Sequence, residues 1–291
     1  MKDKKVFLSI AGSDPSGGAG IQADIKTAVK IGLYPCSVIT AVTAQNTSGV
    51  QGIWSVGNDK LKAQLYSVLS DIRPHALKIG LIGSQEAITV LRSIIEQYEL
   101  TNVVVDPVLS TTLDSRTPDS EFIKLLVTEL FPMATLITPN IPEKEIIEKT
   151  MGTSLEELCE AFLLKGGHSS GKDCEDILFY NNLATPNQEF QSSAFPSITN
   201  SNQPFFPQDS SPLSENEYRR IPVMKKFIHR RLDSENTHGS GCVLSSAVAC
   251  FLAQGLHLEK AVDRALKFTQ EAIKESSSFR LGKGNYGPTL L

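Results

Sequence analysis

Segments with the pattern of a β-strand alternate with segments with the pattern of an α-helix along most of this chain. Repeated βα units of this kind build a mostly parallel sheet with helices on both faces. We therefore expect an α/β fold in which the carboxyl ends of the strands, and the loops that follow them, lie along one edge of the sheet. The expected strands are residues 5–11, 35–41, 75–80, 102–105, 135–138 and 162–165, with strand-like runs at 176–180 and 223–231, and the expected helices are residues 19–31, 60–71, 85–98, 121–130, 142–150, 154–159, 239–254 and 258–277.

One segment departs from this alternation. Residues 181–222 are rich in Ser, Asn, Gln and Pro and carry few periodic apolar residues. Because the segment interrupts two strand-like runs, we expect an exposed, partly disordered surface insertion within a domain rather than a linker between domains. The sequence therefore predicts one domain over residues 1–291.

Charge and cysteine content exclude several classes of protein. The chain has 28 basic and 32 acidic side chains and a net charge of −4, so it has no overall basic field for nucleic acid or anionic lipid. No apolar run reaches the roughly 18 residues that a membrane span needs. The five cysteines are odd in number and form no C-x-x-C pair. We therefore expect reduced thiols in a cytoplasmic protein, without a structural zinc site.

Residues 236–242 have the sequence NTHGSGC and stand directly before a strongly periodic helix. Backbone N–H groups at a helix start favour negative charge, so Gly239, Ser240 and Gly241 predict an anion site. A thiol at the same helix start, here Cys242, is expected to have a lowered pKa. The alternative is a glycine-rich turn that only joins a strand to a helix.

Polar residues also follow three of the expected strands. Asp106 follows one strand, Asn140 and Glu143 follow the next, and Lys165 follows a third. The carboxylates of Asp106 and Glu143, with the Asn140 amide, could hold Mg²⁺ through water. Alternatively, Asn140 and Glu143 only cap a helix, and Asp106 only forms a turn before a proline. The first βα turn is also rich in glycine, but it matches neither a Walker A loop nor a dinucleotide fingerprint.

These motifs together resemble the hydroxymethylpyrimidine/phosphomethylpyrimidine kinases, a family of the ribokinase-like superfamily. The resemblance extends from Ser9 to about Pro288. It is carried by SIAGSDPSGGAGIQAD at 9–24, TAVTAQNT at 40–47, KIGL at 78–81, DPV at 106–108, TPN with Glu143, KGGH at 165–168 and the heptapeptide at 236–242.

The resemblance implies a ribokinase-like fold and ATP-dependent phosphorylation, with Mg²⁺, of the pyrimidine precursor of thiamine and then of its monophosphate. It assigns contacts with the pyrimidine ring to Asp24 and Gln45, and it places Gly12, Leu81 and Val108 in the wall of the ring pocket. Asp106 and Lys165 belong by similarity to the ATP and Mg²⁺ site, with Asn140 and Glu143 organising the metal. Gly239, Ser240 and Gly241 form the anion hole by the same similarity, and Cys242 stands where many ribokinase relatives carry an aspartate base. Family likeness also implies a homodimer.

Several residues depart from the family pattern. Leu81 and Leu109 replace methionines that are more usual in the family, and residues 110–113 lack its typical lysine and glycine. The chain between Glu143 and Lys165 is also about one helix shorter than in typical members. These departures leave a vitamin B6 kinase open as an alternative, while a non-catalytic vitamin sensor is disfavoured because the anion-hole residues are retained. The Gln45 amide favours an aminopyrimidine because it both donates and accepts hydrogen bonds.

Overall fold

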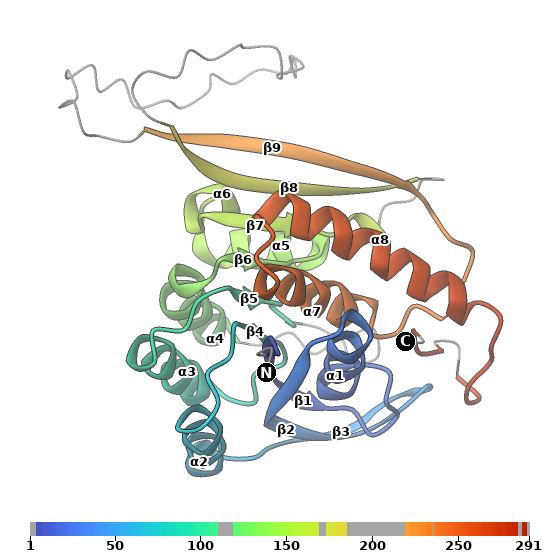
Figure 1. The fold of residues 1–291 in the computed structure, drawn as a ribbon, viewed down its shortest axis with the longest axis horizontal. Helices are drawn as coiled ribbons and strands as arrows, with labels where there is room; N and C mark the ends of the chain where they lie inside the picture. Colours follow the sequence, from blue (N-terminus) through green and yellow to red (C-terminus); the bar gives the residue numbers. More distant parts are fainter. Residues whose placement is uncertain are drawn as a thin grey trace.

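A single sheet runs through the molecule, with helices packed on both of its faces (Figure 1). The computed structural model describes residues 4–109, 119–168, 173–184, 219–234, 236–284 and 287–289. Within these residues the sheet has nine strands in the order β3-β2-β1-β4-β5-β6-β7-β8-β9. The six adjacent strands β2, β1, β4, β5, β6 and β7 are parallel to one another, and β3, β8 and β9 each run antiparallel to a neighbour. The expected α/β class with a mostly parallel sheet is therefore confirmed.

The element boundaries follow the predicted alternation closely. The strands are β1 Val6–Ser13, β2 Tyr34–Asn46, β3 Gly49–Ser55, β4 Ala76–Ile79, β5 Val103–Val105, β6 Leu136–Ile137, β7 Ala161–Leu164, β8 Asp173–Ala184 and β9 Arg219–Arg230. The helices are α1 Gly20–Ile31, α2 Asn58–Leu69, α3 Gln85–Gln97, α4 Ser120–Leu125, α5 Ile141–Met151, α6 Leu155–Leu158, α7 Ser240–Ala253 and α8 Leu258–Ser276. A π-helical turn, Leu126–Leu130, continues α4.

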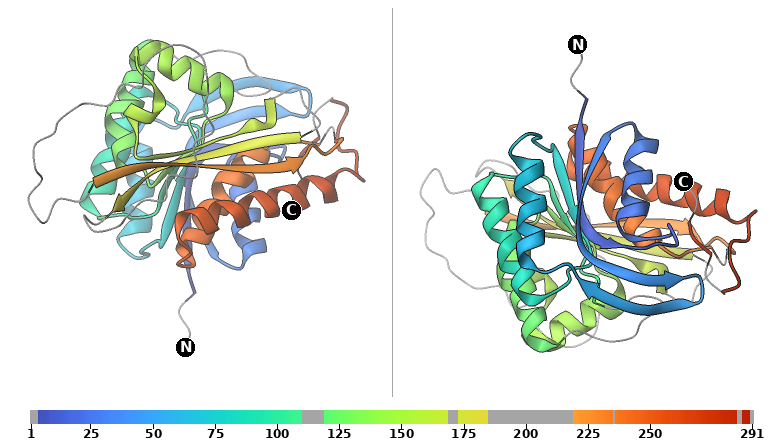
Figure 2. Two further views of the ribbon diagram at one scale, coloured as in Figure 1. Left: turned by 90° about the horizontal axis from the view of Figure 1, so that it is seen from above. Right: turned by 90° about the horizontal axis from the view of Figure 1, so that it is seen from below.

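Two layers of helices enclose the sheet (Figure 2). Helices α1, α7 and α8 pack on one face, and α2 to α6 pack on the other. Successive side chains of a strand point to opposite faces of the sheet, so each strand contributes residues to the cores under both helix layers. In β4, Leu77 and Ile79 belong to the core under α2 to α6, whereas Ala76 belongs to the core under α7 and α8. Lys78 is two residues after Ala76 and therefore lies on the same face of β4, so the strand places a lysine on the face covered by α7 and α8.

Three segments differ from the sequence-based expectation. Strand β2 continues to Asn46 and pairs with β3, which the sequence analysis left without an assignment. Strands β8 and β9 are 12 residues each and pair along their whole length, so residues 181–184 and 219–222 are strand and not insertion. The rest of the expected insertion, residues 185–218, and the loop at 110–113 lie outside the described residues.

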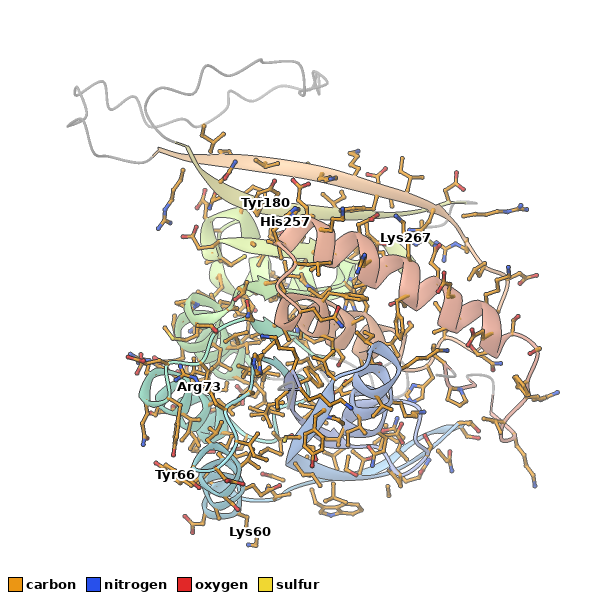
Figure 3. The ribbon with its side chains drawn as sticks, in the orientation of Figure 1. Lys60, Tyr66, Arg73, Tyr180, His257 and Lys267 are labelled. Atoms are coloured by element: carbon orange, nitrogen blue, oxygen red, sulfur yellow. The ribbon has the colours of Figure 1, made fainter. Side chains whose placement is uncertain are left out.

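The outer ribbon of β8 and β9 pairs with β7 and also contacts α8. Tyr180 on β8 donates a hydrogen bond to Glu259, and Lys225 on β9 forms an ion pair of 2.7 Å with the same carboxylate. Tyr180 and His257 accordingly lie together where β8 meets the start of α8 (Figure 3). Among the described helices, none combines the length and the apolar character that crossing a membrane requires.

Candidate active site

A cavity of about 240 Å³ opens at the carboxyl edge of the parallel strands. The segments that follow β1, β4, β5, β6 and β7 reach it, and helices α1 and α7 begin at its wall. The structure therefore gathers at one place residues that are far apart in the sequence. The predicted site residues that line the cavity are Gly12, Gln45, Leu81, Asp106, Val108, Asn140, Glu143, Lys165, Gly239, Ser240, Gly241 and Cys242.

The start of α7 is shaped by a glycine that no other residue could replace without strain. Gly239, the N-cap, has a φ of 79°, and a Cβ atom there would lie 1.8 Å from the carbonyl oxygen of Gly18. The glycine thus lets the first βα loop pack directly against the helix start. The first turn of a helix leaves N–H groups without intrahelical partners. The Ser240 N–H donates to the Thr237 carbonyl at 3.1 Å, and Gly241 and Cys242, which follow it in this turn, line the cavity.

Cys242 does not have the acidic thiol that its helix position predicts. Burial raises the pKa of Cys242, and Asp24 and Asp106 raise it further, while Lys78 and a backbone hydrogen bond from Gly20 lower it. The balance lies above the ordinary value. The sequence-based expectation of a lowered pKa is therefore wrong for the protein without ligands, because it counted the helix dipole and not the desolvation of the thiolate.

The raised pKa predicts how Cys242 reacts with iodoacetamide. The pH at which its alkylation rate is half-maximal should be higher in the folded protein than in the chain unfolded in urea, because only the thiolate reacts. Peptide mass spectrometry after quenched labelling measures this rate for Cys242 alone. Steric shielding of the thiol lowers the maximal alkylation rate at high pH, but it does not move the pH at which the rate is half-maximal. A folded-state midpoint at or below the unfolded one would contradict the raised pKa.

An ion cluster stands opposite the helix start. The Lys165 ammonium lies 2.8 Å from Asp106 Oδ1 and 3.9 Å from Glu143 Oε2. Although burial opposes it, these carboxylates raise the pKa of Lys165, and Lys165 in turn lowers the pKa of Asp106. A Cβ atom on Gly241 would lie 3.5 Å from Lys165 Nζ, so the ammonium faces the anion site directly. Lys165 can therefore meet a phosphate from the side opposite the α7 amides.

Asn140 and Glu143 form a complete capping box at the start of α5. Asn140 Oδ1 accepts from the Glu143 N–H at 2.8 Å, and Glu143 Oε2 accepts from the Asn140 N–H at 2.8 Å. The helix-capping interpretation of this pair is thus correct. Both residues also line the cavity, and burial raises the pKa of Glu143 despite the nearby Lys165. Two carboxylates and an amide fit a Mg²⁺ ion that takes most of its ligands from phosphates and water.

Asp24 does not reach the cavity. Its side chain is 0% exposed, and both of its oxygens lie 3.0 Å from the ammonium of Lys78. Ser9 and Ser246 donate further hydrogen bonds to the same carboxylate, at 2.5 and 2.7 Å. The expectation that Asp24 contacts a pyrimidine ring is corrected here: the carboxylate is fully occupied inside the protein, and Lys78 lines the cavity in its place.

The other residues that the resemblance assigns to a ring pocket, Gly12, Gln45, Leu81 and Val108, line this cavity. A Cβ atom on Gly12 would meet Leu81 at 2.8 Å, so the leucine packs directly over the glycine backbone. The sequence analysis assigned no role to six further lining residues with polar side chains, although the quoted motifs contain them. These are Ser13, Asp14, Thr43, Lys78, Thr237 and His238.

The fold and the site define a class of protein that solved structures share. A phosphomethylpyrimidine kinase from Clostridium difficile is 33% identical, with a TM-score of 0.67, and the match covers 93% of this chain and 100% of that one. An ADP complex of Bacillus subtilis pyridoxal kinase is 25% identical, with a TM-score of 0.73 and coverage of 99% and 97%. This chain is accordingly a small-molecule kinase of ribokinase-like fold.

Sequence comparison narrows the class to one family. The phosphomethylpyrimidine kinase family matches residues 14–199 and 219–289, and the chain belongs to that family. A hydroxymethylpyrimidine/phosphomethylpyrimidine kinase of Rhizobium meliloti is 33% identical over 97% of this chain and 95% of its own length. The thiamine biosynthesis bifunctional protein ThiED of Geobacter sulfurreducens is 36% identical over 97% of this chain, which spans 51% of that longer protein.

Proposed function

We propose that this protein transfers the γ-phosphoryl group of ATP to 4-amino-5-hydroxymethyl-2-methylpyrimidine and then to its monophosphate, in thiamine biosynthesis. One observation carries the proposal. A single cavity holds the α7 amides, the Lys165 ammonium and the Gln45 amide, so an anion site and a polar ring-binding group face the same space. Relatives with the corresponding kinase name match this chain over nearly its whole length.

The cavity supports phosphoryl transfer by neutralising charge and aligning the reactants. This reaction needs little covalent chemistry from the protein, because its transition state is loose and its charge lies on the phosphoryl oxygens. The α7 amides and the ammonium of Lys165 would stabilise that charge from two sides. Asp106, Asn140 and Glu143 would hold Mg²⁺ through water. When bound, Mg²⁺ neutralises charge on the phosphates.

Cys242 would act on the hydroxymethyl group of the substrate. Its sulfur atom accepts a hydrogen bond from the Gly20 N–H, so it lies between the starts of α1 and α7. From there it would orient the alcohol towards the phosphoryl group and accept the alcohol proton as the new bond forms. Because burial raises the pKa of Cys242, most of the thiol is protonated near neutral pH, and proton acceptance would fall to its minor thiolate form.

A vitamin B6 kinase is the second candidate. The match with Bacillus subtilis pyridoxal kinase and the leucine at position 81 favour it. Most of the site would serve either substrate, because the phosphoryl-transfer groups do not contact the ring. Relatives with the pyrimidine kinase name are 33% identical to this chain and the pyridoxal kinase is 25% identical, which favours the first candidate.

Steady-state turnover distinguishes these functions. Purified protein with MgATP is assayed by coupled ADP release against hydroxymethylpyrimidine, its monophosphate and pyridoxal. We expect kcat/KM to be highest for the pyrimidines, with turnover of both of them. Preference for pyridoxal would establish the B6 kinase instead. Tight binding without any turnover would indicate a vitamin sensor.

We also propose that the protein is a cytoplasmic homodimer. All five cysteines are free thiols, which supports a reducing compartment. Val42 and Trp54 are cross-strand partners on β2 and β3 and are 47% and 60% exposed, which supports an apolar contact with a second copy. Sedimentation velocity separates a monomer of 31.7 kDa from a dimer of twice that mass.

A further inference from the structure

His238 lies between two polar side chains of the cavity. Its Nε2 atom is 3.1 Å from Asp14 Oδ2 and 3.0 Å from the amide end of Gln45. Asp14 follows β1, Gln45 lies near the end of β2, and His238 precedes α7, so three distant segments meet at one nitrogen atom. His238 and Asp14 are only 6% and 3% exposed, which leaves water little part in this contact.

The proton on His238 is fixed by Asp14. The carboxylate accepts hydrogen bonds from the Ser16 N–H at 2.8 Å, the Ser16 hydroxyl at 2.7 Å and the Ala19 N–H at 2.9 Å. Although burial raises it, hydrogen bonds from His238 and Ser16 hold the pKa of Asp14 below its ordinary value. Asp14 is therefore ionised and can only accept, so His238 Nε2 must carry the hydrogen that joins them.

Two neighbours then determine which way the Gln45 amide faces. A protonated Nε2 has no lone pair with which to accept from an NH₂ group, so the end of Gln45 that lies beside it must be the carbonyl oxygen, which shares the single Nε2 hydrogen with Asp14. At the other end, Thr43 Oγ1 lies 3.4 Å from Gln45, and its single hydrogen goes to the Ser13 carbonyl at 2.9 Å. Thr43 can therefore only accept from Gln45, which places the NH₂ group on its side. The oxygen and nitrogen of an amide are assigned from such partners.

We propose that His238, held by Asp14, is a positioning residue that fixes the polarity of the Gln45 amide and so selects the substrate ring. The inference rests on the function proposed above. With its carbonyl at the His238 side and its NH₂ at the Thr43 side, Gln45 requires a ligand edge with a donor beside an acceptor. The amino group and adjacent ring nitrogen of a 4-aminopyrimidine form that edge. In the 4-oxo analogue the ring N–H and the carbonyl reverse it.

The surroundings keep His238 from turning to suit another ligand. Its backbone N–H donates to the Gly287 carbonyl at 3.2 Å, and its carbonyl accepts from the Thr289 N–H at 2.9 Å. A Cβ atom on Gly18 would lie 2.6 Å from the imidazole Cδ2, so the ring is in close contact with the first βα loop. A ligand whose donor and acceptor are exchanged would leave polar groups unpaired against Gln45, because the rigid His238 donor keeps the amide from turning. Unpaired polar groups in a binding site are the strongest basis for discrimination between similar ligands.

Calorimetric binding of the 4-aminopyrimidine and its 4-oxo analogue tests the proposal without any turnover. We expect the unaltered protein to bind the aminopyrimidine at least about 100-fold more tightly, and His238→Leu to narrow that ratio to less than about 10-fold. His238→Gln should keep the ratio, because a glutamine NH₂ group can still donate to both Asp14 and Gln45. His257→Gln, a change at the surface near Tyr180 (Figure 3), is the matched control and should change nothing.

The possible outcomes separate a positioning role from a structural one. Equal weakening of both ligands in His238→Leu, with the ratio retained, would overturn the inference and leave the proposed function standing. If His238→Leu does not fold, Asp14→Asn provides the second test, because a neutral partner no longer fixes the histidine proton, and the ratio should again fall. An unaltered ratio in that variant would overturn the inference, and binding of neither pyrimidine by the unaltered protein would overturn the proposed function together with it.

Discussion

Cys242→Ala is expected to lower kcat by about 10²- to 10⁴-fold while the Kd for the pyrimidine changes less than about threefold. The substitution removes the sulfur atom that faces the reacting alcohol, and it leaves the amides of α7 and the ring pocket in place. Single-turnover measurements at saturating ATP give the chemical step, and calorimetry gives the Kd. A kcat within about threefold of the unaltered value would remove Cys242 from the mechanism.

A second cysteine in the same helix provides the control. Cys250 lies on α7 but is 0% exposed in the core under α8, away from the cavity wall. Cys250→Ala should therefore lower stability slightly without slowing turnover. Cys242→Ser then separates the two roles of Cys242, because a hydroxyl can orient the alcohol but loses its proton far less readily than a thiol. Partial recovery in Cys242→Ser would indicate orientation, and none would indicate proton acceptance.

The strand-end rule accounts for what the sequence could predict. Asp106, Asn140 and Lys165 each follow a parallel strand, and parallel strands end at one edge of the sheet. The order of strands along the sequence was therefore enough to predict that these three residues lie close together. Strand β3 was missed because its sequence, GVQGIWS, has two glycines and little alternation. The two-residue turn Thr47–Ser48 connects β3 to β2, and β3 is a strand because it pairs with β2. Its own sequence pattern does not indicate a strand.

The errors at the site have a common physical cause. Asp24 and Lys78 are 54 residues apart, and Asp14 and His238 are 224 residues apart. Periodicity and motif spacing describe a residue's own element and cannot identify a partner on another one. The pKa of Cys242 was misjudged for the same reason: the helix dipole is local, whereas burial and the charges of Asp24 and Asp106 come from tertiary structure.

Lys78→Met is expected to lower the free energy of unfolding by about 3–5 kcal/mol. The Lys78 and Asp24 side chains are both 0% exposed, so the change leaves a carboxylate inside the protein with only the Ser9 and Ser246 hydroxyls as partners. Although burial alone would lower the pKa of Lys78, Asp24 and the nearby acidic groups raise it, so Lys78 carries its positive charge inside the protein. Urea unfolding followed by circular dichroism, without ligands, measures the loss.

A surface ion pair of the same chemistry is the matched control. Lys30 and Glu275 are joined at 2.7 Å, with side chains 40% and 60% exposed, so Lys30→Met should lower the free energy of unfolding by less than about 1 kcal/mol. The two lysines differ in solvation rather than in contact distance, and the comparison therefore isolates burial. Equal losses in the two variants would contradict a destabilising unpaired Asp24.

A double variant tests whether the loss comes from the orphaned charge. In Lys78→Met with Asp24→Asn, the amide oxygen can accept from one of the Ser9 and Ser246 hydroxyls and the NH₂ group can donate to the other, and no buried charge remains. The double variant should therefore be more stable than Lys78→Met alone, even though it carries one more substitution. A double variant less stable than Lys78→Met would mean that the lysine stabilises the protein by packing between the sheet and α7. The ion pair with Asp24 would then not explain the lysine on the α7 face of β4.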